Sequence, residues 1–112
     1  MKRFLLSYDI NADKCTEREI WDALYEMKGL IIEDKPVLST LLLHSEDELM
    51  HRKIAQKLNE KFKGLYFVVC RIGKRTKEDG KIVDCYWDEP NPESQKQIQE
   101  YLEEKQNQKK IN

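Results

Sequence analysis

The stretch from Lys2 to Asn11 limits the fold of this chain more than any other. A nearly continuous apolar run occupies it and comprises Phe4, Leu5, Leu6, Tyr8 and Ile10. Such a run is typical of a central strand that is covered on both faces. Asp9 comes where this strand would give way to a loop, so a single carboxylate is predicted at the tip of a central strand.

The segment after this strand has the pattern of a helix. Thr16 and Glu19 form a predicted capping box, in which the two side chains satisfy free amides at the start of a helix. Gly29 stands where the helix would stop. Between them, apolar residues recur at helical spacing, at Ile20, Leu24 and Met27.

A second helix is predicted on the same grounds. Ser45 and Glu48 have the spacing of a capping box, and Gly64 would end the helix. The apolar positions between them repeat every four residues, at Met50, Ile54, Leu58 and Phe62.

Further strands are predicted around the second helix. Leu30–Glu33 reads as a short strand, Asp34–Pro36 as a turn, and Val37–His44 as a second strand antiparallel to the first. Leu65–Ile72 is aromatic and β-branched, the composition that strands favour most.

The last part of the chain predicts one more strand and a helix. Asp79–Gly80 is a favoured hairpin turn, and Lys81–Trp87 could form a strand after it. Asn91 and Pro92 suit the cap and the first position of a helix. The residues beyond are mostly polar, so this helix is expected to be partly exposed.

This order of elements predicts an α+β fold. Two βαβ-like halves make a ferredoxin-like βαββαβ sandwich, an antiparallel sheet with both helices on one face. We expect residues 1–90 to form this domain, with the extra C-terminal strand, and residues 91–112 to form a helical tail.

The other face of such a sheet would be bare. The predicted strands are apolar on both sides, and an exposed apolar patch of that size usually marks an interface. We therefore expect a homodimer packed through the sheets. The alternative is that the C-terminal strand and helix of the same chain fold back over this face.

Composition excludes some classes of protein. The chain has 112 residues, and its 20 Lys and Arg residues nearly cancel its 21 Asp and Glu residues. Its overall charge therefore gives no general attraction to nucleic acid or anionic membranes. The odd number of cysteines, and the lack of any apolar run near the roughly 20 residues that span a bilayer, favour a cytoplasmic protein with no membrane partner.

The residues Ser7-Tyr8-Asp9-Ile10 at the end of a first strand resemble a known family. They are similar to the small CRISPR-associated adaptation protein, some of whose members are metal-dependent endonucleases, and to its relatives among toxin–antitoxin and phage proteins. The resemblance also covers Leu38–Leu42 and Phe67–Val69. It implies a ferredoxin-like homodimer in which the strand-end aspartates of the two chains face each other.

The resemblance carries over one site residue, Asp9, as the catalytic and metal-binding candidate. A carboxylate oxygen is a hard ligand suited to Mg²⁺ or Mn²⁺, and two carboxylates across a dimer axis could hold one ion. The alternative is that Asp9 caps the loop that follows it.

A basic run that begins at the end of the fourth predicted strand and continues into the loop after it is a candidate for binding RNA or DNA. It comprises Arg71, Lys74, Arg75 and Lys77. Clustered cations bind phosphates, although the same residues would also suit an ordinary solvated loop. Two functions therefore stay open: a nucleic-acid-associated protein with a metal-dependent nuclease site, and a non-catalytic module that binds a protein partner in a defence, mobile-element or phage system.

Overall fold

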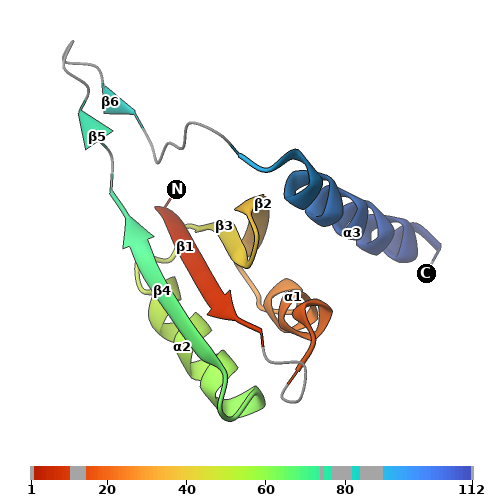
Figure 1. Cartoon of the computed structure of the whole chain (residues 1–112), viewed down its shortest axis with the longest axis horizontal. Coiled ribbons are helices and arrows are strands. Elements are labelled where there is room, and N and C mark those ends of the chain that lie inside the picture. Colours follow the sequence, from red (N-terminus) through yellow and green to blue (C-terminus); the bar gives the residue numbers. More distant parts are fainter. Residues whose placement is uncertain (1, 11–14, 74, 77–81, 84–89, 112) are drawn as a thin grey trace.

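A computed structural model of the chain describes residues 2–10, 15–73, 75–76, 82–83 and 90–111. These residues form a small α+β domain with one four-stranded antiparallel sheet, a two-stranded ribbon and three helices (Figure 1). In chain order the elements are β1 (Lys2–Asp9), α1 (Glu17–Tyr25), β2 (Ile31–Val37), β3 (Thr40–Ser45), α2 (Met50–Lys61), β4 (Tyr66–Ile72), β5 (Arg75–Thr76), β6 (Ile82–Val83) and α3 (Pro92–Ile111).

The main sheet has the strand order β2-β3-β1-β4, and every neighbouring pair is antiparallel. β1 lies between β3 and β4, which confirms that the N-terminal apolar run is a central strand. Leu6 is opposite Leu41 on β3 and Val69 on β4. This register places the apolar residues of three strands side by side.

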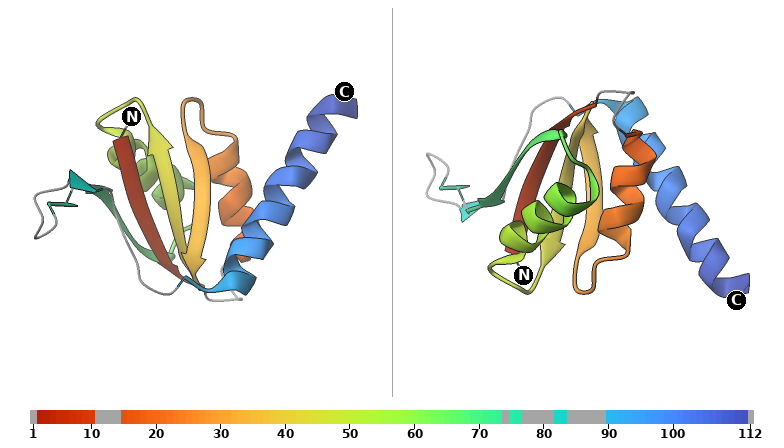
Figure 2. Two further views of the ribbon diagram at one scale, coloured as in Figure 1. Left: turned by 90° about the horizontal axis from the view of Figure 1, so that it is seen from above. Right: turned by 90° about the horizontal axis from the view of Figure 1, so that it is seen from below.

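One face of the sheet is covered by α1 and α2 (Figure 2). Side chains alternate along a strand, and every second residue of β1 points to this face and is buried, namely Phe4, Leu6 and Tyr8. They pack in one core with buried residues of both helices, including Ile20, Leu24, Ile54 and Leu58. The sequence predicts β1 to be covered on both faces. Among the described residues, the helices cover only the face that carries Phe4, Leu6 and Tyr8.

The predicted start and end signals of α1 are confirmed. Thr16 and Glu19 form both hydrogen bonds of a capping box. Gly29 has a φ of 81°, and Gly64 after α2 has a φ of 85°. Glycine adopts these left-handed conformations without the steric cost that a Cβ brings.

Two predicted boundaries are wrong. Ser45 does not cap α2, because it stays in β3 opposite Lys2, and the first residue of α2 is Met50. The turn predicted at Asp34–Pro36 lies inside β2, where the pairing with β3 shifts register and so accommodates the proline. The chain turns at Leu38–Ser39 instead, with Ser39 at a φ of 58°.

The C-terminal helix α3 lies beside α1 and along β2, the edge strand of the sheet (Figure 2). The Asn91 side chain accepts from the amides of Glu93 and Ser94, as predicted for a capping residue. Ile98 and Tyr101 are buried in the core. This helix therefore packs on the helix side of the domain, and it does not cover the opposite face of the sheet.

The predicted C-terminal strand Lys81–Trp87 is described only in part. Ile82–Val83 pairs with Arg75–Thr76 as the ribbon β5–β6, while Asp79–Gly80 lies outside the described residues. Among the described helices, none is long and apolar enough to cross a membrane.

Candidate functional site

Asp9 ends β1 and its side chain is exposed. Because Phe4, Leu6 and Tyr8 point into the core, alternation directs Asp9 to the opposite side of the sheet. Its partner across the ladder is Tyr66, the first residue of β4, which is 77% exposed. The carboxylate therefore stands at one end of the sheet face that α1 and α2 leave uncovered, which we call the open face.

The exposed apolar surface of the open face is concentrated on β4. Val68 is 68% exposed and lies two residues from Tyr66 on the same side of the strand. In the middle of the face, Leu5 is half-buried and Leu42 is buried. The apolar patch is thus narrower than the sequence predicts and lies beside Asp9.

The other end of the open face carries a charged cluster that the sequence analysis did not identify. Arg3 Nε and Nη2 donate to the two carboxylate oxygens of Glu33, at 3.3 and 3.2 Å. His44 Nδ1 lies 3.3 Å from Glu33 Oε2. Arg3, Glu33 and His44 are polar residues within otherwise apolar strands, and this is the sequence signal that could have identified the cluster. Arg3 and His44 are direct neighbours in the β1–β3 register.

Behind Asp9, a buried polar network fixes the end of β1. The Tyr8 hydroxyl donates to Glu17 Oε2 at 2.6 Å, and the ammonium of Lys35 donates to Glu17 Oε1 at 3.0 Å. Lys35 also donates to Gln97 of α3 at 2.9 Å, and Trp21 Nε1 donates to the Tyr8 hydroxyl. We call this the Tyr8–Glu17–Lys35 network.

Lys35 is the unusual member of this network because its side chain is only 1% exposed. Lysine is almost never fully buried unless it is paired. Here its ammonium has two oxygen partners and lies 5.2 Å from the centre of the Trp21 ring. The network joins β1, α1, β2 and α3, so the strand residue next to Asp9 is held from the helix side.

The Tyr8 hydroxyl serves this network as a hydrogen-bond donor. Burial and the hydrogen bond to Glu17 both raise the pKa of Tyr8 well above its usual value. The hydroxyl therefore stays protonated at neutral pH.

Within the described part of the chain, Asp9 is not part of a complete metal site. Among the described residues, no three side chains of His, Cys, Asp or Glu gather closely enough to hold an ion. Mg²⁺ keeps several waters and is usually bound through one or two carboxylates. Asp9 could therefore contribute one carboxylate to such a site.

Arg71, the one basic candidate whose side chain is described, does not lie next to Asp9. Arg71 is exposed, but it pairs with Phe4, so it lies five residues along β4 from Tyr66, or roughly 16 Å at the rise of a strand. Alternation also places it on the opposite side of the sheet. Arg75 begins β5, while its side chain and the residues Lys74 and Lys77 lie outside the described part.

An acidic residue of α1 anchors the C-terminal helix. Asp22 Oδ1 accepts a hydrogen bond from the Tyr101 hydroxyl at 2.6 Å and lies 3.1 Å from the ammonium of Lys105. Burial alone would raise the pKa of Asp22, but the hydrogen bonds from Tyr101 and Lys105 outweigh it and hold the pKa below its usual value. The same hydrogen bond, together with burial, raises the pKa of Tyr101.

We expect Asp22 to make stability depend on acid pH. The pKa of Asp22 is lower in the folded state than in the unfolded state, where it is about 3.9. The stability that the ionised carboxylate contributes to the fold is therefore complete above about pH 3.9, and it is lost as the pH falls through the folded-state pKa. Urea unfolding between about pH 6 and pH 2 should show a smaller loss of stability for Asp22→Asn than for the wild type. An identical loss in both proteins would contradict this role.

Comparisons with known proteins assign this chain to no family. No protein-family model, no curated protein and no solved structure gives a significant match to its sequence. The geometry described above is therefore the basis of the functional proposal that follows.

Proposed function

We propose that this chain is a ferredoxin-like protein that forms a homodimer through its open face and acts on nucleic acid. In this proposal the Asp9 carboxylates of two copies form one metal-binding and catalytic site. The observation that carries it is the position of Asp9, exposed at the rim of an uncovered sheet face and beside an apolar patch.

The ferredoxin-like assignment rests on topology. Two interlocked βαβ units place the first and third strands in the middle of the sheet and both helices on one face. The order β2-β3-β1-β4, with α1 and α2 on the same side, agrees with this arrangement. The resemblance of Ser7–Ile10 to the CRISPR-associated and toxin–antitoxin proteins supports the same assignment and suggests an endonuclease.

The homodimer rests on the apolar patch of β4. Each fully buried valine or aromatic side chain contributes about 1.5–3 kcal/mol relative to exposure. Tyr66 and Val68 are both largely exposed in the single chain. A second copy placed on this patch would bury four such side chains and bring the two Asp9 residues to the same interface.

The chain's own residues would supply two functions at this site. The paired carboxylates would bind Mg²⁺ or Mn²⁺, and the bound ion supplies Lewis-acid stabilisation of phosphate oxygen and an activated water. The Tyr8–Glu17–Lys35 network would hold the end of β1, next to Asp9.

The test is cleavage of labelled RNA and DNA by the purified wild-type protein with Mn²⁺, and with Mg²⁺, against a control with excess chelator. Chelator-sensitive cleavage of either polymer supports the proposal. The absence of both binding and cleavage under every condition would favour the second candidate, a non-catalytic module for a protein partner. One observation favours that candidate: Asp9 and Arg71 lie far apart in the single chain, so the described basic candidate is not beside the proposed catalytic carboxylate.

Val68→Glu is expected to dissociate the homodimer. Two copies would each place a carboxylate in an apolar contact, and we expect the dimer dissociation constant to rise about 100-fold or more. Sedimentation velocity over a range of protein concentrations measures this change.

The matched control for the dimer is Leu49→Glu, since Leu49 is also an exposed apolar residue, 50% accessible, just before α2. It should sediment as the wild type does. A wild-type protein that is monomeric at micromolar concentration, or a Val68→Glu variant that remains dimeric, would contradict the proposed interface.

A further inference from the structure

The surface of α2 is basic, although the chain as a whole is nearly neutral. This helix carries four cations and one carboxylate, namely Arg52, Lys53, Lys57 and Lys61, and Glu60. The neighbouring helix α1 has the opposite balance, with three carboxylates and one cation. Acidic and basic groups are therefore separated between the two helices that cover the sheet, and α2 has a local positive charge that the overall composition conceals.

Three of these cations form one row along the helix. Lys53, Lys57 and Lys61 are four residues apart, so their side chains project from the same side of α2. Successive members are about 6 Å apart along the helix axis, at the rise of an α-helix. The ammonium of Lys53 forms an ion pair with Asp47, whereas Lys57 and Lys61 have no acidic partner among the described residues. We call these three residues the lysine row.

The lysine row as a whole does not stabilise the helix that carries it. Like charges four residues apart on a helix repel each other. The first turn of α2 contains no acidic residue, and Arg52 and Lys53 place positive charge near the end where the helix dipole is already positive. Within the row, only Lys61 in the last turn is well placed for the dipole. The stability of α2 therefore gives no reason for the row, whereas a ligand with negative charges does.

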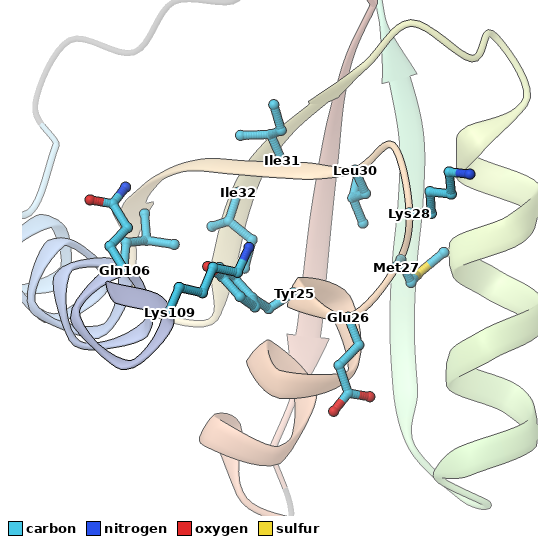
Figure 3. A pocket seen from close by; sticks show the side chains of 10 residues that line it. Tyr25, Glu26, Met27, Lys28, Leu30, Ile31, Ile32, Gln106 and Lys109 are labelled. Atoms are coloured by element: carbon cyan, nitrogen blue, oxygen red, sulfur yellow. The ribbon is translucent and has the colours of Figure 1, made fainter. Parts of the chain in front are cut away.

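Two further lysines extend this surface beyond α2. The turn after α1 lies against the start of α2, since a Cβ at Gly29 would be 3.8 Å from Met50 Cε. In that turn, the Lys28 side chain is directed toward α2 and away from the cavity between α1, β2 and α3 (Figure 3). At the other end, Lys63 is exposed in the turn after the helix. The basic surface therefore continues past both ends of the lysine row.

The C-terminal end of this surface lies at the same end of the domain as Asp9. Tyr66, the first residue of β4, follows Lys63 closely in the sequence and pairs with Asp9 across the ladder. α2 thus ends beside the start of β4, and β1 ends there too (Figure 1). A linear ligand along the lysine row would reach the end of the sheet at which Asp9 stands.

The chemistry of the row favours a phosphate backbone as the ligand. Nucleic acids carry negative charges at regular intervals along each strand. A row of ammonium groups at regular spacing matches such a ligand better than it matches the scattered carboxylates of a protein surface. An anionic membrane is a poorer match, because helices that bind membranes insert an exposed apolar face. The apolar residues Met50, Ile54 and Leu58 of α2 are buried in the core instead.

We propose that the lysine row binds the phosphate backbone of a nucleic acid, with Lys28 and Lys63 adding contacts at its ends. This inference rests on the proposed function, because it names the surface by which the chain would hold the nucleic acid that Asp9 acts on. Binding itself needs neither the metal ion nor the homodimer. Contacts to phosphate carry no sequence information, so two unrelated sequences of equal length should bind with the same affinity.

The experiment measures the fluorescence anisotropy of a short labelled single-stranded RNA, and of the matching DNA, with excess chelator and at several salt concentrations. The variant Lys57→Gln/Lys61→Gln should weaken binding about tenfold at low salt and lower the slope of log affinity against log salt by about 1.5. The conservative variant Lys57→Arg/Lys61→Arg keeps both charges and should bind as the wild type does. Circular dichroism of each variant checks that the fold is retained.

The matched control removes two lysines from another helix. Lys96 and Lys109 are exposed on α3, and Lys96→Gln/Lys109→Gln causes the same change of net charge. Because these residues lie outside the lysine row, the affinity should change less than about twofold.

Three outcomes would overturn the phosphate site. The first is a wild-type protein that binds neither labelled strand at low salt. The second is an equal loss of affinity in the row and control variants, which would indicate general attraction to positive charge. The third is binding to phosphatidylserine vesicles that the row variant loses while its affinity for nucleic acid is unchanged, which would assign the row to a membrane.

Failure of this inference and failure of the nuclease proposal give different results. Binding that depends on the lysine row, without cleavage when Mn²⁺ or Mg²⁺ is added, would support the phosphate site and contradict the nuclease proposal. Metal-dependent cleavage by the wild type, with unchanged binding by the row variant, would contradict the phosphate site and leave the nuclease proposal intact.

Discussion

Asp9→Asn is expected to lower metal-dependent cleavage by at least about 100-fold. Metal-ion catalysis stabilises charge by several kcal/mol, and each 1.36 kcal/mol is a factor of ten in rate. The amide of asparagine has the shape of the carboxylate but no negative charge, so the two copies would no longer attract a divalent ion. The measurement is the initial rate of cleavage as a function of Mn²⁺ concentration.

The same variant separates catalysis from the structural alternative for Asp9. Asparagine caps turns as aspartate does, so Asp9→Asn should unfold at the same urea concentration as the wild type. Glu103→Gln, which removes an exposed carboxylate on α3, serves as the control and should keep full activity. Equal cleavage by wild type and Asp9→Asn would exclude Asp9 from the chemistry and leave it as a loop residue.

Lys35→Ala is expected to lower the free energy of unfolding by about 3 kcal/mol. Breaking a buried ion pair by removing one partner costs about 3–5 kcal/mol, because the other charge loses its compensation. We expect a cost near the lower end of this range, because the Glu17 side chain is 27% exposed and water can partly solvate its carboxylate once Lys35 is removed. The loss of the contact with Gln97 should also weaken the attachment of α3 to β2.

Urea unfolding, followed by far-ultraviolet circular dichroism, measures this difference. Lys57→Ala is the matched control, because Lys57 is a half-exposed lysine on α2, and the change should cost less than about 0.5 kcal/mol. If Lys35→Ala unfolds within that margin of the wild type, the network does not stabilise the domain. Amide hydrogen exchange in α3 would show whether the helix opens more readily.

Asp9 and Lys35 differ in how well the sequence alone could identify them. Asp9 is recognisable because it interrupts an apolar run at the point where a strand must end. Lys35 carries no local signal, and the sequence predicts a turn at its position. Its partners Glu17 and Gln97 are 18 and 62 residues away, so only the packing of β2 between α1 and α3 makes its burial possible.

The wrong boundaries have a related cause. Ser45 and Glu48 have the spacing of a capping box, but Ser45 also faces Lys2 across the central ladder. The backbone pairing of β3 with β1 takes precedence, and the Ser45 hydroxyl accepts from the amide of Asp47 instead. In β2, a shift of register accommodates Pro36, and an edge strand tolerates the missing donor.

By itself the sequence determined the order of strands and helices, the cap of α1, the glycine stops and the central place of β1. These features follow from local chemistry: periodicity, backbone conformation and hydrogen bonds between residues a few positions apart. Only the tertiary structure decided where α3 lies, which lysine is buried, how narrow the apolar patch is and how far Arg71 is from Asp9. Those properties depend on contacts between distant segments, and no local pattern records which segments will meet.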